Sequence, residues 1–220
     1  MIAIVPIRSG SKSIIDKNIK IINGKPLIYW VLNALEKSKV SKIILATDSK
    51  KYIEIVNNFN LTKVNTFLRS DVNSQDKSSS ESVLIEVIKK ENISEDIIFC
   101  QATSPTTLST DIDNAIDLYD KYDSVLSVVR QKRFIWDNSG KPTNYNYFKR
   151  PRRQDFQGYL VENGAIYISH STAIINNNSR ISGTIGLYEM KEYSYYEIDE
   201  VEDFLIVESL MKNQIIVSEK

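Results

Sequence analysis

The architecture of this chain is set by residues 2–18, IAIVPIRSGSKSIIDKN. Residues 2–7 are almost wholly apolar, which is typical of a β-strand covered on both faces of its sheet. The residues that follow place three cations, Arg8, Lys12 and Lys17, among small serine and glycine residues. A buried strand that leads directly into a cationic loop predicts an α/β sheet that holds an anion at the end of its first strand.

The rest of the chain continues the alternation that this strand begins. Apolar runs of strand length alternate with segments whose apolar residues recur at helical spacing. Strands joined by helices in this rhythm form right-handed crossovers, so we expect an α/β fold with a mostly parallel twisted sheet and flanking helices. The further strands expected are KIILAT (42–47), VNTFL (64–68), DIIFCQ (96–101), SVLSVV (124–129) and GAIYIS (164–169).

Local signals mark where the helices begin. Pro26 is expected at the first position of one helix, and Ser78 with Glu81 resembles a capping box for another. Thr110 and Asp113 are expected to cap a further helix. A last helix is expected after the turn at YYEIDE, and the apolar residues expected to pack it down are Phe204, Ile206, Val207 and Leu210.

The length of 220 residues fits one domain with an elaborated insertion. The rhythm of strands and helices stops after Arg130, and residues 131–160 are polar, aromatic and basic, with KRPRRQ in their middle. This segment is too long for a plain connecting loop. We interpret residues 1–220 as a single domain in which residues 131–160 form an inserted lobe or a subunit contact.

Composition excludes several classes of partner and metal site. Lysine plus arginine and aspartate plus glutamate are equal at 28 each, so neither nucleic acid nor a membrane surface is an expected partner. Cys100 and His170 are the single cysteine and histidine, which excludes a disulfide framework and argues against a histidine-based zinc site. We see no signal peptide or membrane-spanning run, and expect a cytoplasmic protein.

In open sheets of this kind, ligands bind beyond the carboxyl ends of the strands. The segments that leave the expected strand ends are therefore predicted to converge on one cleft. They are Arg8–Asn18, Thr47–Ser49, Arg69–Ser80 and Gln101–Thr107.

The loop after the first strand has the chemistry of a phosphate site. Ser9, Gly10 and Ser11 are small enough for backbone N–H groups to approach an anion, and the neighbouring cations suit a triphosphate. The loop is neither a Walker A sequence nor G-x-G-x-x-G. A solvated loop with incidental lysines is the alternative that this pattern alone leaves open.

Six segments of the chain, taken in order, match one family pattern. They are IAIVPIRSGSKSIIDKNIKIINGKPLI (2–28), ATDSKK (46–51), FLRSDVNSQDKSSSESV (67–83), CQATSPTT (100–107), RRQDFQGYLVENGAIYI (152–168) and EIDEVEDF (197–204). Each resembles a segment of the CMP-sialic acid synthetases, also called acylneuraminate cytidylyltransferases. No single segment is specific, but six in the same order are.

This resemblance implies an α/β nucleotidyltransferase fold with Rossmann-like topology, and a homodimer in which the inserted lobe completes the partner's sugar pocket. It implies that CTP and a nine-carbon 2-keto-3-deoxy sugar acid, of sialic or legionaminic type, give a CMP-sugar and pyrophosphate. The resemblance further implies that the anomeric hydroxyl attacks the α-phosphorus in line, with Mg²⁺ as the cofactor. Other sugar acids, Kdo-like or pseudaminic, and a catalytically degenerate nucleotide-binding module are the alternatives.

The resemblance also implies roles for individual residues in binding the nucleotide. Arg8 and Lys17 would neutralise charge on the β- and γ-phosphates as pyrophosphate departs. Arg69 in a surface ion pair and Ser80 as a helix cap are the structural alternatives for two of the others. The implied nucleotide-binding residues are Arg8, Ser11, Lys12, Lys17, Asn18, Arg69 and Ser80.

For the sugar, the matching residues are Gln101 near the reaction centre, Arg153 beside the sugar carboxylate, and Asn163 facing the sugar. A guanidinium is the natural bidentate partner of a carboxylate. The alternatives are a strand-end amide bonded to backbone for Gln101 and a solvated basic face for Arg153. Arg8, Lys17, Gln101 and Asp199 are the implied catalytic residues.

Asp199 matches a metal-binding carboxylate, and Glu197 stands where the family usually has aspartate. Carboxylates two positions apart on an extended segment point to the same side, so the pair is expected to hold one Mg²⁺, with water in the remaining positions. The longer side chain of Glu197 leaves binding through a water open. The alternative is a capping role at the start of the last helix.

Some positions depart from the family pattern. Ser13 replaces a glycine, Ala102 replaces a proline, and Thr107 stands where an arginine is usual. These departures leave nucleotide transfer plausible and leave the identity of the sugar acid open. No histidine lies in a matched segment, so a general base is not assigned.

Overall fold

The computed structural model describes residues 1–75 and 77–218, except for the side chains of residues 214–218. Its main sheet has seven strands in the order β5-β4-β1-β6-β8-β7-β9. The strands are β1 (Ile2–Ile7), β4 (Lys42–Thr47), β5 (Val64–Leu68), β6 (Asp96–Cys100), β7 (Ser124–Gln131), β8 (Tyr159–His170) and β9 (Ile185–Met190). Strand β8 is antiparallel to both of its neighbours, and the other pairs are parallel.

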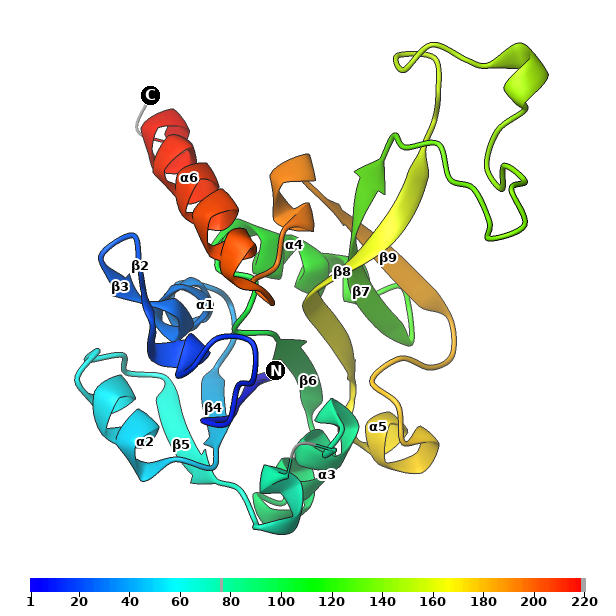
Figure 1. The fold of residues 1–220 in the computed structure, drawn as a ribbon. Coiled ribbons are helices and arrows are strands. Elements are labelled where there is room, and N and C mark those ends of the chain that lie inside the picture. The colour runs from blue at the N-terminus through cyan, green and yellow to red at the C-terminus, as the bar shows by residue number, and fades with distance from the viewer. Residues whose placement is uncertain (76, 219–220) are drawn as a thin grey trace.

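Helices cover both faces of this sheet, as Figure 1 shows. They are α1 (Leu27–Glu36), α2 (Lys50–Asn57), α3 (Ser80–Lys90), α4 (Ser109–Tyr119), α5 (Ser171–Asn177) and α6 (Val201–Ser218). Helices α1, α2 and α4 pack on the face to which Ala3 and Val5 point, whereas α3 and α5 pack on the face of Ile2 and Ile4. Both faces of β1 are thus buried, which explains why its sequence is apolar throughout.

The first loop and the last helix form a third, smaller cluster. Ile14 of the loop and Ile22 and Leu27 of the following segment pack against Val207 and Met211 of α6. A two-stranded hairpin, β2 (Ile21–Ile22) with β3 (Lys25–Pro26), lies beside them. The end of the chain therefore returns to its beginning, at the edge of the sheet where ligands are expected.

The expected strands are confirmed, and β8 begins earlier than GAIYIS suggested. Strand β9 and helix α5 had no counterpart in the sequence analysis. Half of the side chains of β9 are solvent-exposed, so its sequence lacks the continuous apolar character of a central strand. Helix α5 has seven residues, too few for a helical period to be recognised.

Several expected helix starts were wrong by about one residue. Pro26 is the N-cap of α1 and not its first residue, because its backbone is still extended. Ser79, and not Ser78, caps α3 by accepting the backbone N–H of Ser82. At α4 the side chain of Asp111 accepts the N–H of Leu108, in place of a cap by Thr110 and Asp113.

In α6, Val207 and Met211 form the buried face. Ile206, expected to pack inward, is 41% exposed and lies outside that face. None of the helices that the structure describes combines the length and apolar character needed to cross a membrane.

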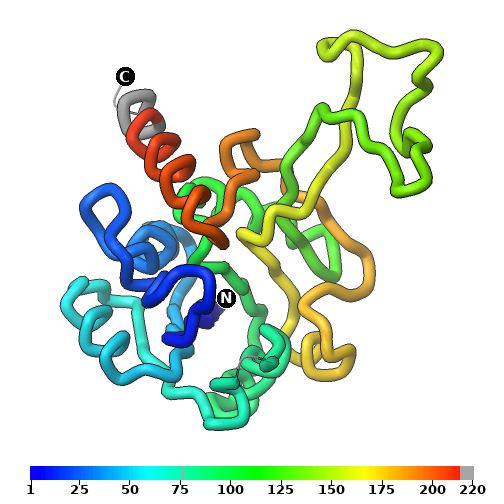
Figure 2. The backbone as a smooth tube through the Cα atoms, viewed as in Figure 1, coloured from blue at the N-terminus to red at the C-terminus, as the bar shows by residue number. Residues whose placement is uncertain are grey.

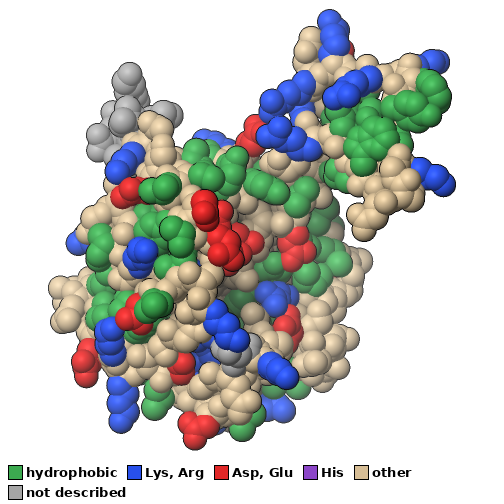
Figure 3. All heavy atoms as spheres, viewed as in Figure 1, with side chains coloured by type: hydrophobic (Ala, Val, Ile, Leu, Met, Phe, Trp, Pro, Cys, Tyr) green, Lys and Arg blue, Asp and Glu red, His purple; other side chains and the backbone are tan. Residues whose placement is uncertain are grey.

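Residues 132–158 leave the sheet between β7 and β8 and project from the body of the molecule (Figures 1 and 2). An aromatic cluster forms the core of this lobe. Phe134 lies 4.2 Å from Tyr145 and 5.0 Å from Phe156 between ring centroids, and the guanidinium of Arg150 lies 4.4 Å from the Phe134 ring. Figure 3 shows apolar side chains gathered on the lobe with basic side chains around them.

Candidate active site

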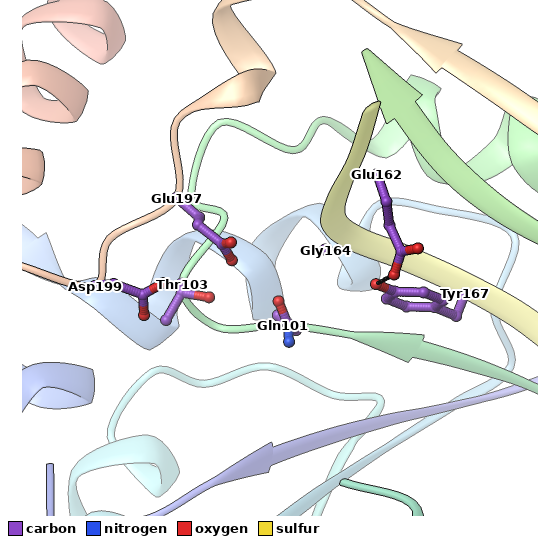
Figure 4. A pocket seen from close by; sticks show the side chains of 7 residues that line it. All are labelled: Gln101, Thr103, Glu162, Gly164, Tyr167, Glu197 and Asp199. Atoms are coloured by element: carbon purple, nitrogen blue, oxygen red, sulfur yellow. Dashed lines mark hydrogen bonds between the residues drawn. The ribbon is translucent and has the colours of Figure 1, made fainter. Parts of the chain in front are cut away.

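Two adjoining hollows lie beyond the carboxyl ends of β1 and β6. We call the first the loop hollow; it has a volume of about 200 Å³. We call the second the acidic hollow; it has a volume of about 360 Å³ and is drawn in Figure 4. Gln101 and Thr103 line both of them, so the two hollows form one continuous site.

Different chemistry lines the two hollows. The loop hollow is lined by Pro6, Ile7, Arg8, Ser11, Lys17, Asn18, Ser80, Phe99, Gln101, Ala102 and Thr103. The acidic hollow is lined by Gln101, Thr103, Glu162, Gly164, Tyr167, Glu197 and Asp199. Figure 3 shows acidic side chains near the middle of this face, where α6 begins, and basic side chains close to them.

Hydrogen bonds hold the first loop in place at both of its ends. At the start, Asp48 accepts from the backbone N–H and from the hydroxyl of Ser9, at 2.8 and 3.1 Å. At the end, Asn18 is buried and its amide donates to the Arg8 carbonyl at 2.9 Å, which closes the loop on itself. These contacts fix both ends of the loop beside the loop hollow.

Lys17 joins the loop to the segment before α6. Its ammonium lies 3.0 Å from Asp199 Oδ1 and donates to the Ile198 carbonyl at 2.8 Å. The hydroxyl of Ser13 donates to the Asp199 carbonyl. The cationic loop and the acidic pair, far apart in the sequence, thus face each other across one site.

Glu197 and Asp199 project from one extended segment into the acidic hollow, as the sequence analysis expected (Figure 4). Burial, together with the negative charge of Asp199, raises the pKa of Glu197 above its usual value. A raised carboxylate pKa indicates that positive charge at this position would be favourable.

The two carboxylates, Glu197 and Asp199, have the chemistry of a divalent-cation site. Two carboxylates that share one hollow fit a hard cation such as Mg²⁺, which prefers oxygen ligands and retains several waters. Among the described residues no group of three or more histidine, cysteine, aspartate or glutamate side chains could enclose a metal. The residues therefore fit a cation that takes its remaining ligands from water or from a phosphate.

Gln101 stands between the two hollows, at the end of β6. Turned by 180° from the orientation drawn in Figure 4, its amide nitrogen donates to Glu197 Oε2 at 3.2 Å and to the Gly164 carbonyl at 3.0 Å. A Cβ at position 164 would lie only 2.4 Å from this same amide atom, which is drawn as Oε1 in Figure 4. Glycine at 164, with φ of +71°, is thus what allows this amide to lie between the loop and the acids.

The structure brings most of the expected residues to this site, with exceptions. Arg69 is buried and lies outside both linings; its guanidinium donates to the Ile7 carbonyl at 3.1 Å and to the Asn73 carbonyl. The hydrogen bond to Ile7 ties the end of β1 to the residue that follows β5. Burial lowers the pKa of the Arg69 guanidinium. Lys12 belongs to the loop but does not line the loop hollow.

Asn163 is likewise buried, and its side chain does not line the acidic hollow. Its amide accepts from the Ser127 hydroxyl at 2.6 Å and donates to the Ser194 carbonyl at 3.0 Å. Alternation along the strand explains the difference from the expected direction, because Asn163 points inward where Glu162 points to the hollow. In this structure Asn163 holds the backbone that presents Gly164.

Arg153 lies in the lobe, away from both hollows of its own chain. Its side chain is 66% exposed and pairs with Glu192 at 3.4 Å. The sequence analysis missed Thr103, Glu162, Tyr167 and Phe99 as lining residues. Thr103 lies in the segment expected to reach the cleft and Tyr167 in the NGAIYI segment, so both had a signal that was not used.

A cationic loop after the first strand of an α/β sheet, at the edge where ligands bind in such sheets, is typical of nucleotide-binding α/β proteins. A family model described as cytidylyltransferase matches residues 2–220. The chain belongs to this cytidylyltransferase family.

Individual relatives agree with this assignment. N-acylneuraminate cytidylyltransferase A of Danio rerio is 36% identical over 216 residues, which is 94% of this chain and 49% of that protein. CMP-N,N'-diacetyllegionaminic acid synthase of Legionella pneumophila is 28% identical over 226 residues, which is 96% of this chain and 96% of that protein. The chain spans about half the length of the first of these relatives and nearly all of the second.

Among solved structures, CMP:2-keto-3-deoxy-manno-octonic acid synthetase complexed with CTP superposes with a TM-score of 0.70. Its identity to this chain is 17%, and the match covers 97% of this chain and 98% of that structure. At this identity the likeness concerns the fold, and it confirms the expected α/β architecture of nucleotidyltransferase type.

Proposed function

We propose that this protein joins CTP to a nine-carbon 2-keto-3-deoxy sugar acid and releases pyrophosphate. The observation that carries the proposal is the pair of hollows that meet at Gln101, one lined by cations and small residues and the other by carboxylates. The names of the relatives support the substrate class, because they include cytidylyltransferases for N-acylneuraminate and for diacetyllegionaminic acid.

In this proposal the triphosphate of CTP lies in the loop hollow. Arg8 and Lys17 line that hollow and neutralise the charge that develops on the β- and γ-phosphates, while Ser11 and Ser80 offer small polar groups at close range. The loop is already ordered by Asp48 and Asn18, so little reorganisation accompanies binding. The sugar acid enters from the acidic hollow, and its anomeric hydroxyl attacks the α-phosphorus in line.

Mg²⁺ is the proposed cofactor, and Asp199 and Glu197 are the residues that would hold it. When bound, it supplies charge neutralisation for the phosphate oxygens. Asp199 is 63% exposed and accessible to a cation, although its ion pair with Lys17 has to loosen or be shared. Lys17 remains anchored by the Ile198 carbonyl, so it keeps its place beside the phosphates.

A homodimer is also proposed, because Arg153 lines neither hollow of its own chain and pairs instead with Glu192. Several aromatic side chains of the lobe are exposed, among them Phe148 at 80%. If the lobe of one chain covers the acidic hollow of a second, Arg153 can pair with the sugar carboxylate there. A cytoplasmic location remains a prediction.

The test is to incubate the protein with CTP, Mg²⁺ and a panel of sugar acids, and to follow pyrophosphate. Turnover with a nine-carbon acid supports the proposal; turnover only with an eight-carbon acid points to a different cytidylyltransferase. Arg8→Ala and Asp199→Ala are each expected to lower kcat/KM by roughly a hundredfold or more, whereas Lys37→Ala, at an exposed lysine that ends α1, is the control. CTP binding without pyrophosphate from any acid would favour a nucleotide-binding module.

A further inference from the structure

Strand β8 contains an irregularity that opens directly onto the acidic hollow. Leu126 of β7 is opposite Tyr167, and Val128 is opposite Glu162, so two steps along β7 correspond to five along β8. Side chains five positions apart on a regular strand point to opposite faces. Because of this bulge, Glu162 and Tyr167 instead line the same hollow.

Polar contacts behind the strand hold the bulge open. The Ser127 hydroxyl donates to Asn163 Oδ1 at 2.6 Å and accepts the backbone N–H of Ile166 at 2.9 Å. Since these groups are buried and paired, the conformation that presents Glu162 is well determined.

Within the hollow, the Tyr167 hydroxyl donates to Glu162 Oε1, as the dashed line in Figure 4 shows. Burial and this hydrogen bond raise the pKa of Tyr167, so the hydroxyl stays protonated and remains a donor. The ring is held from its other side by Arg180, whose guanidinium lies 4.9 Å from the Tyr167 centroid and 4.7 Å from that of Phe99. Arg180 is itself paired with Glu81 at 2.6 Å.

These contacts fix one oxygen of the Glu162 carboxylate and leave the other for a ligand. An ionised carboxylate only accepts hydrogen bonds. The charge of Arg180 is engaged by Glu81, and the two other carboxylates of the hollow belong to the proposed cation site on a different segment. Glu162 is exposed to the hollow, and a cationic ligand group there would donate a charge-assisted hydrogen bond to its second oxygen, which is stronger than the bond a neutral group could make.

We propose that Glu162, held by Tyr167, makes the sugar subsite selective for an acid that carries a cationic nitrogen substituent. An amidinium or ammonium group would donate a charge-assisted hydrogen bond to Glu162. This inference rests on the proposed transfer reaction and adds to it the kind of substituent that the subsite reads. It assigns Glu162 a role in specificity and Tyr167 a positioning role.

The sharpest test uses two isosteric sugar acids. One carries an acetamidino substituent on a ring carbon, and the other carries an acetamido substituent at the same carbon. Pyrophosphate release gives kcat/KM for each, and the ratio of the two values measures the selectivity. We expect the wild-type protein to favour the amidine about tenfold, because hydrogen bonds between charged partners are stronger than neutral ones. In Glu162→Gln the carboxylate charge is lost while the shape is kept, and the ratio should fall to about one.

A second variant separates positioning from charge. Tyr167→Phe keeps the ring between Arg180 and the hollow but releases the carboxylate, so the ratio should fall partway, mainly through KM. Glu54→Gln, at an exposed glutamate of α2, is the matched control and should keep the wild-type ratio.

The outcomes distinguish this inference from the reaction on which it rests. A wild-type ratio of one or less, or a ratio unchanged in Glu162→Gln, overturns the selectivity while leaving the transfer reaction intact. If neither acid gives pyrophosphate, the proposed transfer is overturned, and the selectivity is overturned with it.

Discussion

At the scale of single residues, Gly164 matters because it has no side chain. Its left-handed backbone and its missing side chain let Gln101 approach both the Gly164 carbonyl and Glu197. Gly140, in the lobe, has a similar positive φ but no neighbouring atom within 4 Å of the position that a Cβ would take. The two glycines therefore differ in their surroundings and share their backbone conformation.

Gly164→Ala and Gly140→Ala are accordingly a matched pair. Both are expected to lose about 1 kcal/mol of stability through the left-handed backbone, as measured by urea unfolding. Only Gly164→Ala should displace Gln101 and lower kcat/KM for CMP-sugar formation by about a hundredfold. Equal activities in the two variants would show that the position of Gln101 is not critical.

The residue scale also marks the limit of motif reading. The six segments that match the family pattern indicated that Arg8, Lys17, Gln101 and Asp199 lie around one site, and these residues line the two adjoining hollows. The segments could not give the direction in which Asn163 points, because the side chains of β8 alternate and only its pairing with β7 shows that Glu162, and not Asn163, faces the hollow. Arg69 matched a motif as well, but its side chain is used to join two strand ends.

At the scale of elements, α3 both contributes to the loop hollow and holds the segment before it. Ser80, its first residue, lines the hollow, while Glu86 accepts from the Ser70 backbone N–H at 3.0 Å and from the Asn73 amide at 2.7 Å. Lys90 pairs with the same carboxylate at 2.8 Å. Glu86 therefore fixes the turn after β5 against the helix.

This role of Glu86 leads to a pH dependence. Burial opposes ionisation, but hydrogen bonds from Lys90, Asn73 and Ser70 outweigh it and lower the pKa of Glu86 from 4.5 to about 2. Because the pKa is lower in the folded protein, this stabilisation is complete above the unfolded value of 4.5 and is lost as the pH falls towards 2.

Glu86→Gln should therefore be less stable than the wild type at pH 7, by roughly 2 kcal/mol, and the difference should shrink between pH 5 and pH 2. Chemical unfolding at a series of pH values measures this. Glu54→Gln is the control with an exposed glutamate. A constant difference across this range would contradict the role assigned to the carboxylate.

At the scale of the whole molecule, two distant segments complete the site. The chain returns after β9 so that Glu197 and Asp199 meet the first loop, and the small cluster of Ile14, Ile22 and Val207 holds α6 in that position. The lobe has the opposite character, since it projects from the sheet and exposes aromatic side chains. This combination is the physical basis for the proposed homodimer.

Light scattering at micromolar concentration is expected to give a particle of about twice the 25.2 kDa chain mass. Phe148→Asp should shift the protein towards the monomer by placing a charge on the exposed aromatic surface. Leu205→Asp, at a residue of α6 that is 71% exposed, is the control and should leave the mass unchanged. A wild-type monomer would count against the dimer.

The sequence by itself determined the alternation of buried strands and helices and the cationic loop after the first strand. These features are local, because burial on both faces and phosphate binding each require particular residue types at close spacing. Tertiary structure alone decided that Lys17 meets Asp199, that β8 runs antiparallel with a bulge, and that Glu162 and Tyr167 share one hollow. Such contacts depend on how segments far apart in the chain pack together, and no local pattern of residues encodes that arrangement.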